Sequence, residues 1–220
     1  MSQPPRGLVL LSLDLVGIDQ IVPSHFGYSA IRNDGRLIYW GEADFGDAVS
    51  LLQSDVVKVF SSVDPEHNET DGAMVALKGD GTVVAWGRPN RGGDLTSVAG
   101  LLQGEVQDIY SGAGGFVAVR KDGQLVAWGD PAYGGINGFV PSSSSVPIVD
   151  IQHTWNAYAA LRADGSVFTW GDNIRGGDSS AVASQLASGV VAIRSSEGSF
   201  VAIKDNGGVV TWGNTKPRGG

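Results

Sequence analysis

A Trp-Gly pair that returns five times constrains this chain more than any other feature. The tryptophans of these pairs are separated by 46, 42, 42 and 42 residues. Six residues before each tryptophan stands an aspartate or asparagine followed by glycine. The tryptophans are Trp40, Trp86, Trp128, Trp170 and Trp212, and the turn residues are Asp34, Asp80, Asp122, Asp164 and Asn206. A period of this length is typical of repeat folds, in which stacked units bury one another's apolar faces.

The copies extend over about 17–41, 56–87, 106–129, 148–171 and 190–213, with connectors between them. We therefore expect residues 1–220 to form a single repeat domain. Each copy has the pattern of three strands, for example 106–111, 116–120 and a third strand that runs into Trp128. The Asp-Gly or Asn-Gly pair between the second and third strands is a strong hairpin signal. The sequence thus predicts an antiparallel meander in every copy.

Comparison of the copies indicates how neighbouring sheets pack. The middle of the second strand is always alanine, and two residues earlier stands a large side chain that strand alternation places on the same face. The alanines are Ala30, Ala76, Ala118, Ala160 and Ala202, and the large residues are Tyr28, Met74, Phe116, Tyr158 and Phe200. We predict that these alanines and the repeat tryptophans form the structural core, because large and small side chains interlock in a packed interior.

The connectors differ from one another. Three of them begin with an aspartate that suits a helix N-cap, Asp47, Asp94 and Asp178, and Gly100 or Gly189 could end a two-turn helix. The third connector contains the run 140–147, whose two prolines and four serines exclude a helix. We expect short helices at some outer edges and irregular loops at others.

A three-stranded sheet cannot bury both faces by itself, so the copies must stack. Radial stacking into a β-propeller leaves only short, protected edges. The predicted fold is all-β, a propeller of five three-stranded blades, with residues 8–15 as an outer strand or closing segment. Whether five blades close into a ring alone stays open, and completion by another chain is the alternative.

The repeat resembles that of the regulator-of-chromosome-condensation family, including the shorter-bladed β-lactamase-inhibitor propellers. The segment 160–171 (ALRADGSVFTWG) and its four equivalents carry the resemblance, which covers residues 17–220. It implies a β-propeller that binds proteins through loops at its ends.

The chain departs from the chromatin-associated members in three ways. Gly-Gly replaces their Gly-Gln-Leu-Gly segment, only Arg6 precedes the first repeat as a basic residue, and no insertion matches a nucleotide-exchange wedge. The fold transfers, whereas the exchange activity does not.

Composition excludes several classes of function. A net charge of −8 and a pI near 4.7 oppose nucleic-acid binding. No apolar run approaches the roughly 20 residues of a membrane span. The apolar stretch 7–16 does not fit a secretory signal peptide, because it contains Asp14 and lacks a cleavage site. We therefore expect a soluble chain, with an intracellular location favoured. The three histidines fall in three different copies, and no catalytic, metal or cofactor motif occurs, so we expect neither an enzyme nor a cofactor.

Basic residues occupy one equivalent position just before each hairpin turn. These residues are Arg32, Lys78, Arg120, Arg162 and Lys204. In a propeller they would form a basic rim able to hold an anion or an acidic partner. The alternative, which we favour, is that each one pairs with acidic groups in a nearby turn.

Two further segments interrupt the repeat. The second copy carries eight extra residues, in which five side chains could bind a partner: Asp64, Glu66, His67, Glu69 and Asp71. They could also gather a divalent cation, but their spacing matches no calcium loop, and a solvated acidic loop is the simpler interpretation. His153 and Trp155 stand outside the tryptophan register and are candidates for a partner contact.

From these observations we predict a non-catalytic protein-binding or scaffold module, monomeric or part of a larger assembly, with a partner that the sequence does not identify. Two alternatives remain open. The chain could be a structural subunit completed by another chain, or a propeller that binds carbohydrates or small ligands. A cluster of exposed aromatic residues at one end would favour the ligand-binding alternative.

Overall fold

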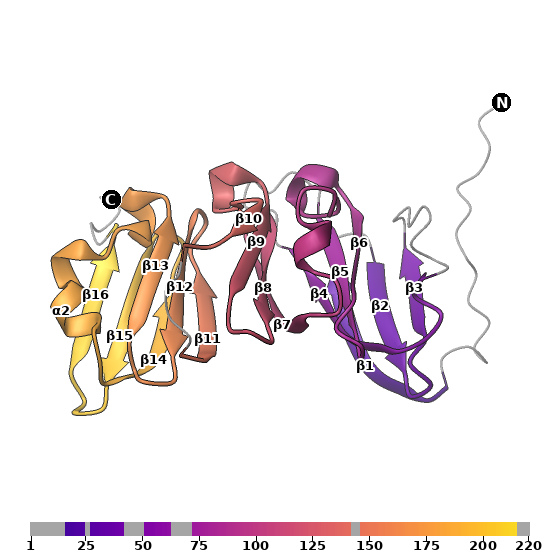
Figure 1. Cartoon of the computed structure of the whole chain (residues 1–220), viewed down its shortest axis with the longest axis horizontal. Helices are drawn as coiled ribbons and strands as arrows, with labels where there is room; N and C mark the ends of the chain where they lie inside the picture. Colours follow the sequence, from indigo (N-terminus) through magenta and orange to yellow (C-terminus); the bar gives the residue numbers. More distant parts are fainter. Residues whose placement is uncertain (1–15, 25–26, 42–50, 63–71, 142–145, 215–220) are drawn as a thin grey trace.

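The computed structural model describes residues 16–24, 27–41, 51–62, 72–141 and 146–214. These residues form five antiparallel sheets that lie side by side in chain order (Figure 1). Blade 1 consists of β1 (Ile18–Ser24), β2 (Gly27–Arg32) and β3 (Leu37–Gly41), and blade 2 of β4 (Val56–Ser61), β5 (Ala73–Lys78) and β6 (Val83–Gly87). Blade 3 consists of β7 (Val106–Gly112), β8 (Gly115–Arg120), β9 (Leu125–Gly129) and β10 (Gly138–Phe139). Blade 4 consists of β11 (Ile148–His153), β12 (Ala157–Arg162) and β13 (Val167–Gly171), and blade 5 of β14 (Val190–Ser195), β15 (Ser199–Lys204) and β16 (Val209–Gly213). The all-β propeller architecture predicted from the repeat is confirmed.

Every blade has the same strand register and the same tight turn. In blade 3, Ala118 faces Ile109 on one neighbouring strand and Val126 on the other. The Asp122 side chain accepts a hydrogen bond from the backbone N–H of Gln124 at 3.0 Å, which closes the hairpin. Gly123 has a φ of 81°, a left-handed conformation that glycine adopts without a steric penalty. The turn chemistry expected from the Asp-Gly pairs is therefore present.

The connectors contain less helix than we expected. Asp94 accepts a hydrogen bond from the N–H of Thr96 at 2.8 Å, and Asp178 from that of Ser180 at 2.8 Å, so both close turns and do not cap a two-turn helix. The second connector holds two 3₁₀ turns, Pro89–Arg91 and Ala99–Leu101, with Gly100 inside the second. The fourth holds a 3₁₀ turn (Ser180–Val182) and the one-turn helix α2 (Ala183–Leu186). Serine, aspartate and glycine favour local turns over helix in such short segments. Asp47 lies outside the described residues.

The third connector adds a strand that the sequence pattern did not predict. In β10, Gly138 and Phe139 pair with Ala127 and Val126 of β9, which makes blade 3 four-stranded. A two-residue strand leaves no period in the sequence, so only the structure reveals it.

The core consists of interfaces between neighbouring blades. We call the side of a blade that carries the repeat tryptophan and alanine its front face, and the other side its back face. At the junction of blades 3 and 4, front-face residues Tyr158 and Trp170 pack in one buried cluster with back-face residues Val117, Val119 and Leu125. The three other junctions bury equivalent residues in the same arrangement. The predicted interlocking of sheets is thus observed at each of the four junctions.

The five blades form an open arc, with blade 1 and blade 5 at opposite ends (Figure 1). The first strands of adjacent blades contact one another, so β1, β4, β7, β11 and β14 lie along the inner side. Apolar side chains fill each junction from the inner strands out to the connectors. At the junction of blades 2 and 3, Val98 and Leu102 of the connector lie in the same buried cluster as Trp128. Blades 1 and 5 do not contact each other in this arrangement, since they lie at opposite ends of the row (Figure 1). A ring closed by this chain alone is therefore not observed, and residues 8–15 lie outside the described part.

Candidate functional site

The candidate residues fall on two opposite edges of the arc. The turn rim carries the Asp-Gly hairpins and the beginnings of the first strands, and it is the lower edge in Figure 1. The connector rim carries the ends of the third strands at the Trp-Gly pairs. The basic positions lie on the turn rim, whereas His153 and Trp155 lie on the connector rim. The candidates Asp64, Glu66, His67, Glu69 and Asp71 lie outside the described residues.

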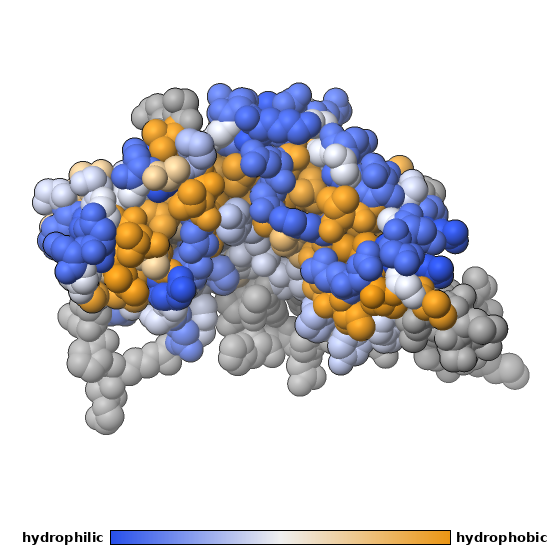
Figure 2. Space-filling model, turned by 90° about the horizontal axis from the view of Figure 1, so that it is seen from below, coloured by the Kyte–Doolittle hydropathy of each residue, from blue (hydrophilic) through white to orange (hydrophobic). Residues whose placement is uncertain are grey.

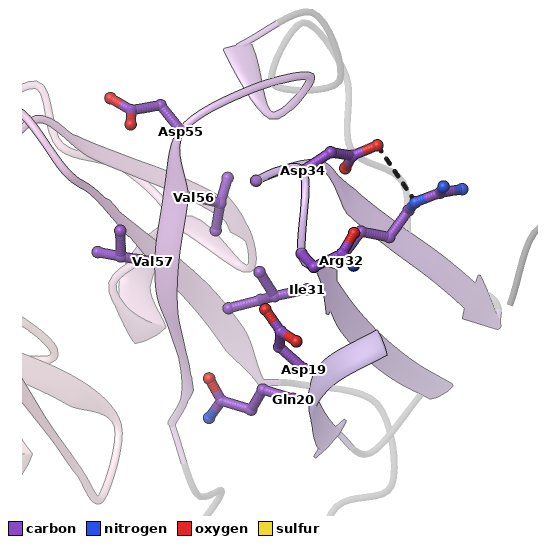
Figure 3. Close-up of a pocket in the computed structure, with 10 residues that line it drawn as sticks. Asp19, Gln20, Ile31, Arg32, Asp34, Asp55, Val56 and Val57 are labelled. Carbon is purple, nitrogen blue, oxygen red and sulfur yellow. Dashed lines mark ion pairs between the residues drawn. The ribbon is translucent and has the colours of Figure 1, made fainter. Parts of the chain in front are cut away.

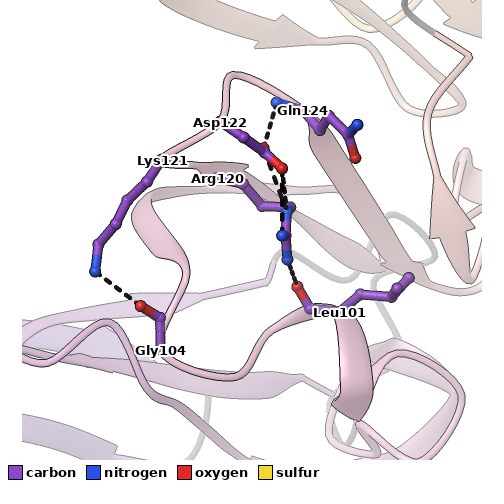
Figure 4. Close-up of polar contacts among 6 residues, drawn as sticks. All are labelled: Leu101, Gly104, Arg120, Lys121, Asp122 and Gln124. Atoms are coloured by element: carbon purple, nitrogen blue, oxygen red, sulfur yellow. Dashed lines mark hydrogen bonds and ion pairs between the residues drawn. The ribbon is translucent and has the colours of Figure 1, made fainter.

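Arg120 shows how a basic side chain of the turn rim is held (Figure 4). Its guanidinium lies 3.3 Å from a carboxylate oxygen of Asp122 and donates a hydrogen bond to the carbonyl of Leu101. Its central carbon also stands 5.8 Å from the ring centre of Phe139. Next to it, Lys121 Nζ donates to the carbonyl of Gly104 at 2.7 Å. These contacts join the hairpin of blade 3 to the end of the connector that precedes the blade.

Two other blades use a lysine in the same way. Lys78 Nζ donates to the carbonyl of Leu51 at 3.4 Å. Lys204 Nζ donates to the carbonyl of Gln185, in the last turn of α2, and to that of Ser188, which follows α2. Basic side chains commonly satisfy the free carbonyls where a helical turn ends. In three blades, therefore, the basic position connects a strand to the preceding connector.

The two remaining basic residues also have partners within the chain. Arg32 Nε lies 3.4 Å from Asp34. Arg162 donates to Ser166 Oγ at 3.4 Å and stands 4.3 Å from the ring centre of Phe168, and its partial burial lowers the pKa of its guanidinium. Each basic position therefore has an intramolecular contact, and a basic rim that holds an external anion stays a prediction.

Trp155 lies where blade 4 meets blade 5, and His153 lies beside Tyr158 on the front face of blade 4. His153 Nδ1 lies 3.0 Å from the carbonyl oxygen of Thr154, and burial lowers the pKa of the ring. The backbone N–H of Trp155 donates to the carbonyl of Glu197 in blade 5 at 3.0 Å, and the Arg175 guanidinium carbon stands 5.2 Å from the Trp155 ring centre. Both side chains thus have contacts within the chain while remaining partly exposed. Their contact with a partner stays a prediction.

The structure adds a surface feature that the repeat analysis missed. The second residue of each first strand is a bulge, where the strand register shifts by one residue. In blades 2, 4 and 5 this residue is a valine, and the exposed fractions of Val57, Val149 and Val191 are 49%, 52% and 58%. Pairs of adjacent β-branched residues, such as Val56-Val57, were the available signal. A strand cannot bury two adjacent side chains on one face, so one of them must turn outward.

A cleft of about 710 Å³ opens on the turn rim between blades 1 and 2 (Figure 3). The residues that line it include the bulge residues Asp19 and Val57 and the acidic residues Asp34 and Asp55, of which Val57 and Asp55 point their side chains away from its centre (Figure 3). The Arg32–Asp34 ion pair lies along one side of it. Its lining thus combines apolar and acidic residues. In the part of the chain that the structure describes, no group of three or more His, Asp or Glu side chains could hold a metal ion.

Viewed from below, toward the turn rim, the molecule shows apolar surface along both halves of the arc, interleaved with hydrophilic surface (Figure 2). Exposed large aromatic side chains do not gather in one place among the described residues, since Tyr28 belongs to blade 1 and Phe139 to blade 3. Across the described ranges, no helix has the length and apolar character needed to cross a membrane.

Comparison with solved structures confirms the type of fold. No protein-family model and no curated protein sequence matches the chain. Human WBSCR16 is similar over 89% of this chain and 61% of its own chain, with 18% identity and a TM-score of 0.58. Prp20p of Saccharomyces cerevisiae, the yeast RCC1, is similar over 89% of this chain and 58% of its own, with 16% identity and a TM-score of 0.57. The ectodomain of the Physcomitrella patens receptor kinase CR4 aligns over 90% of this chain and 50% of its own, with 14% identity and a TM-score of 0.51.

The described blades therefore have the RCC1-like propeller architecture that the repeat motif predicts. At these identities the likeness concerns the fold alone. The chain spans about three fifths of the length of the first two structures, which agrees with an arc that does not complete a turn.

Proposed function

We propose that this chain is a non-catalytic protein-binding or scaffold module and that its turn rim docks a protein partner. The observation that carries the proposal is the half-exposed valine at one equivalent bulge in three blades, Val57, Val149 and Val191. Asp19 and Gln107 occupy the same position in blades 1 and 3 and are also exposed. The fold therefore does not require an apolar residue there.

The energetics favour a contact at these valines. Complete burial of a valine side chain contributes about 1.5–3 kcal/mol, and each of these is only half buried in the free chain. Because the three valines are held on strands of a repeat scaffold, a partner that covers them meets a surface already in place. Such preorganisation reduces the entropy cost of association.

The charged surroundings indicate the chemistry of the partner. Asp19 and Asp55 line the cleft beside Val57, and the whole chain has a net charge of −8. An apolar patch flanked by lysine or arginine would complement this surface. A nucleic-acid partner is disfavoured by the same charge.

The fold supports the general class of function. The reported study of Prp20p concerns its binding to Gsp1p and histones, and a second structure contains Prp20 bound to Kap60. Propellers of this type are thus used to bind proteins. His153 and Trp155 belong to our proposal as a second contact surface, on the connector rim, and the 64–71 segment is proposed from its sequence as a further partner-binding loop.

The test is affinity capture from source cells followed by measurement of Kd with the purified partner. The variant Val57→Asp/Val149→Asp/Val191→Asp places charge on the turn rim. Ile174→Asp places a charge on the opposite, connector rim, next to Arg175, which contacts Trp155, and therefore reports on the second proposed contact surface. We expect the triple variant to weaken binding at least about 100-fold, since each lost apolar contact costs about 1 kcal/mol or more. Equal Kd values for the triple variant and the wild type would refute docking on the turn rim.

A further inference from the structure

The interior of the arc follows one pairing rule. At the four described junctions, the front face of one blade packs on the back face of the blade before it. The front face supplies the tryptophan, the alanine and a large residue, and the back face supplies aliphatic residues. Among the described blades, two faces at the ends of the arc have no such neighbouring sheet, the front face of blade 1 and the back face of blade 5 (Figure 1).

The front face of blade 1 carries the residues of a buried interface but is exposed. Ile21 is 56% exposed, whereas its equivalents in the other four blades are at most 6% exposed. Tyr28 is 48% exposed, against at most 4% for its equivalents. The rings of Tyr28 and Trp40 are nevertheless stacked at 5.6 Å, close to the 5.5 Å of the buried Phe116–Trp128 pair. This face thus has the ring geometry of an interface without a neighbouring sheet.

The back face of blade 5 is exposed in the same way. Ile203 and Val209 are 40% and 62% exposed, whereas the equivalent Val119 and Leu125 of blade 3 are at most 8% exposed. Val201 completes the aliphatic row, as Val117 does in blade 3. Most positions that form these two faces are uncharged; the exceptions are Arg194, which pairs with Val201 on blade 5, and Arg32 at the turn end of blade 1. The uncharged positions are Ser199, Val201, Ile203, Val209 and Thr211 on blade 5, and Ile21, Tyr28, Ala30, Ile38 and Trp40 on blade 1.

We propose that copies of this chain associate head to tail, with the front face of blade 1 of one copy on the back face of blade 5 of the next. These observations specify a second copy as the occupant. Each copy has one free front face and one free back face, and within the chain a front face packs on a back face at all four junctions. The contact is heterologous, so it generates a ring or a filament and not a two-fold symmetric dimer. It uses the ends of the arc and goes beyond the partner docking proposed for the turn rim.

The test uses two complementary variants in light scattering after size exclusion, over a range of concentrations. Ile21→Glu places a charge on the front face of blade 1, and Val209→Glu places one on the back face of blade 5. Ile174→Glu is the matched control, because it adds the same charge away from both end faces. Circular dichroism and urea unfolding at low concentration verify that each variant is folded.

We expect the wild type and Ile174→Glu to form species of several times 22.8 kDa that grow with concentration, and each end-face variant alone to remain at 22.8 kDa. A mixture of the two end-face variants keeps one intact front face and one intact back face, so it should give a species of twice that mass and nothing larger. This pattern distinguishes a heterologous contact from every two-fold symmetric one.

The proposal is overturned if the wild type remains at 22.8 kDa at all concentrations. That result would mean that the two ends of the arc stay free, contact each other within one chain, or bind only a different protein. Unchanged association of either single variant, or a mixture that stays monomeric, also overturns it. The turn-rim triple variant separates this proposal from the previous one. It should self-associate like the wild type, whereas Ile21→Glu should still bind the turn-rim partner.

Discussion

The junction between blades 3 and 4 and the free end of blade 1 present the same kinds of side chain in opposite environments. At the junction, Ile151, Tyr158 and Trp170 are buried against the back face of blade 3. At the end of the arc, the equivalent Ile21 and Tyr28 are exposed. The local structure is nevertheless the same, because both blades have the same register and both pairs of rings are stacked.

The difference shows that a blade determines the composition of its faces but not their burial. Burial is supplied by the neighbour, as expected for a repeat protein whose stability is approximately a sum of unit and interface contributions. Interior substitutions should therefore remove two contributions, the packing within a blade and the interface with its neighbour. Substitutions at the end should remove only the first. Each of the following predictions is measured by equilibrium urea unfolding under conditions where the chain is monomeric.

The largest contrast should appear at the repeat tryptophans. Trp128 is fully buried, and its indole N–H donates to the carbonyl of Gly92 at 3.0 Å, so Trp128→Ala should reduce the free energy of unfolding by about 3–5 kcal/mol. Trp40 is only partly buried, and Trp40→Ala should cost less than about 2 kcal/mol, because the transfer free energy follows the area removed from water. Equal losses would show that the end face is covered in solution.

The isoleucines of the first strand give the most closely matched pair. Ile151→Ala should cost about 2–5 kcal/mol, because it leaves a cavity under Trp170 and Tyr158. Ile21→Ala should change stability by no more than about 0.5 kcal/mol, as is usual for an exposed position. If the self-association that we propose occurs, the cost of Ile21→Ala should rise with protein concentration.

Tight packing at the interior junction can be tested by adding a methyl group. A Cβ at Gly112 would overlap the hydroxyl group of Tyr158 in the next blade, so Gly112→Ala should destabilise the chain by about 1–3 kcal/mol. At Gly100, no other group lies within 4 Å of the added carbon, and Gly100→Ala serves as the control with little effect. Similar results for both variants would mean that blades 3 and 4 adjust freely to each other.

The smallest effect should be a pH dependence at the connector rim. Burial lowers the pKa of His153 from its usual 6.5, so the folded chain binds the proton less readily than the unfolded chain. This contribution to stability is fully present above pH 6.5 and is lost as the pH falls through the folded-state pKa. Between pH of about 7.5 and about 5.5, the wild type should lose more stability than His153→Gln. Parallel losses would contradict the assignment.

Much of the local structure could be predicted from the repeat. The spacing of the Trp-Gly and Asp-Gly pairs predicted three strands per copy and the tight turn at Gly123. Strand alternation predicted that Ala160 packs against a neighbouring sheet. These features could be predicted because hairpin chemistry and strand alternation are local properties. The two-turn helix expected after Asp94 was wrong, since a side chain that can cap a helix can equally close a turn, whereas a short helical segment, 180–186, does follow Asp178. The strand β10 was missed because its pairing depends on a neighbouring strand and not on its own pattern.

The candidate sites depended more strongly on tertiary structure. The sequence placed Arg120 and its equivalents at one repeated position, but not against the carbonyls of the preceding connector. For the exposed Val57, Val149 and Val191 the adjacent β-branched residues were the one signal in the sequence, and it does not identify a bulge, because a shift of register is a property of two paired strands.

The sequence by itself determined the unit, which is a meander closed by an Asp-Gly turn, with a tryptophan and an alanine on its front face. Only the tertiary structure decided how many such units complete a turn and which faces remain free. The angle between neighbouring blades is set by the combined volume of side chains that belong to different repeats and to the connectors between them. Five copies of one local pattern therefore specify each blade, while their packing leaves an open arc with two complementary ends.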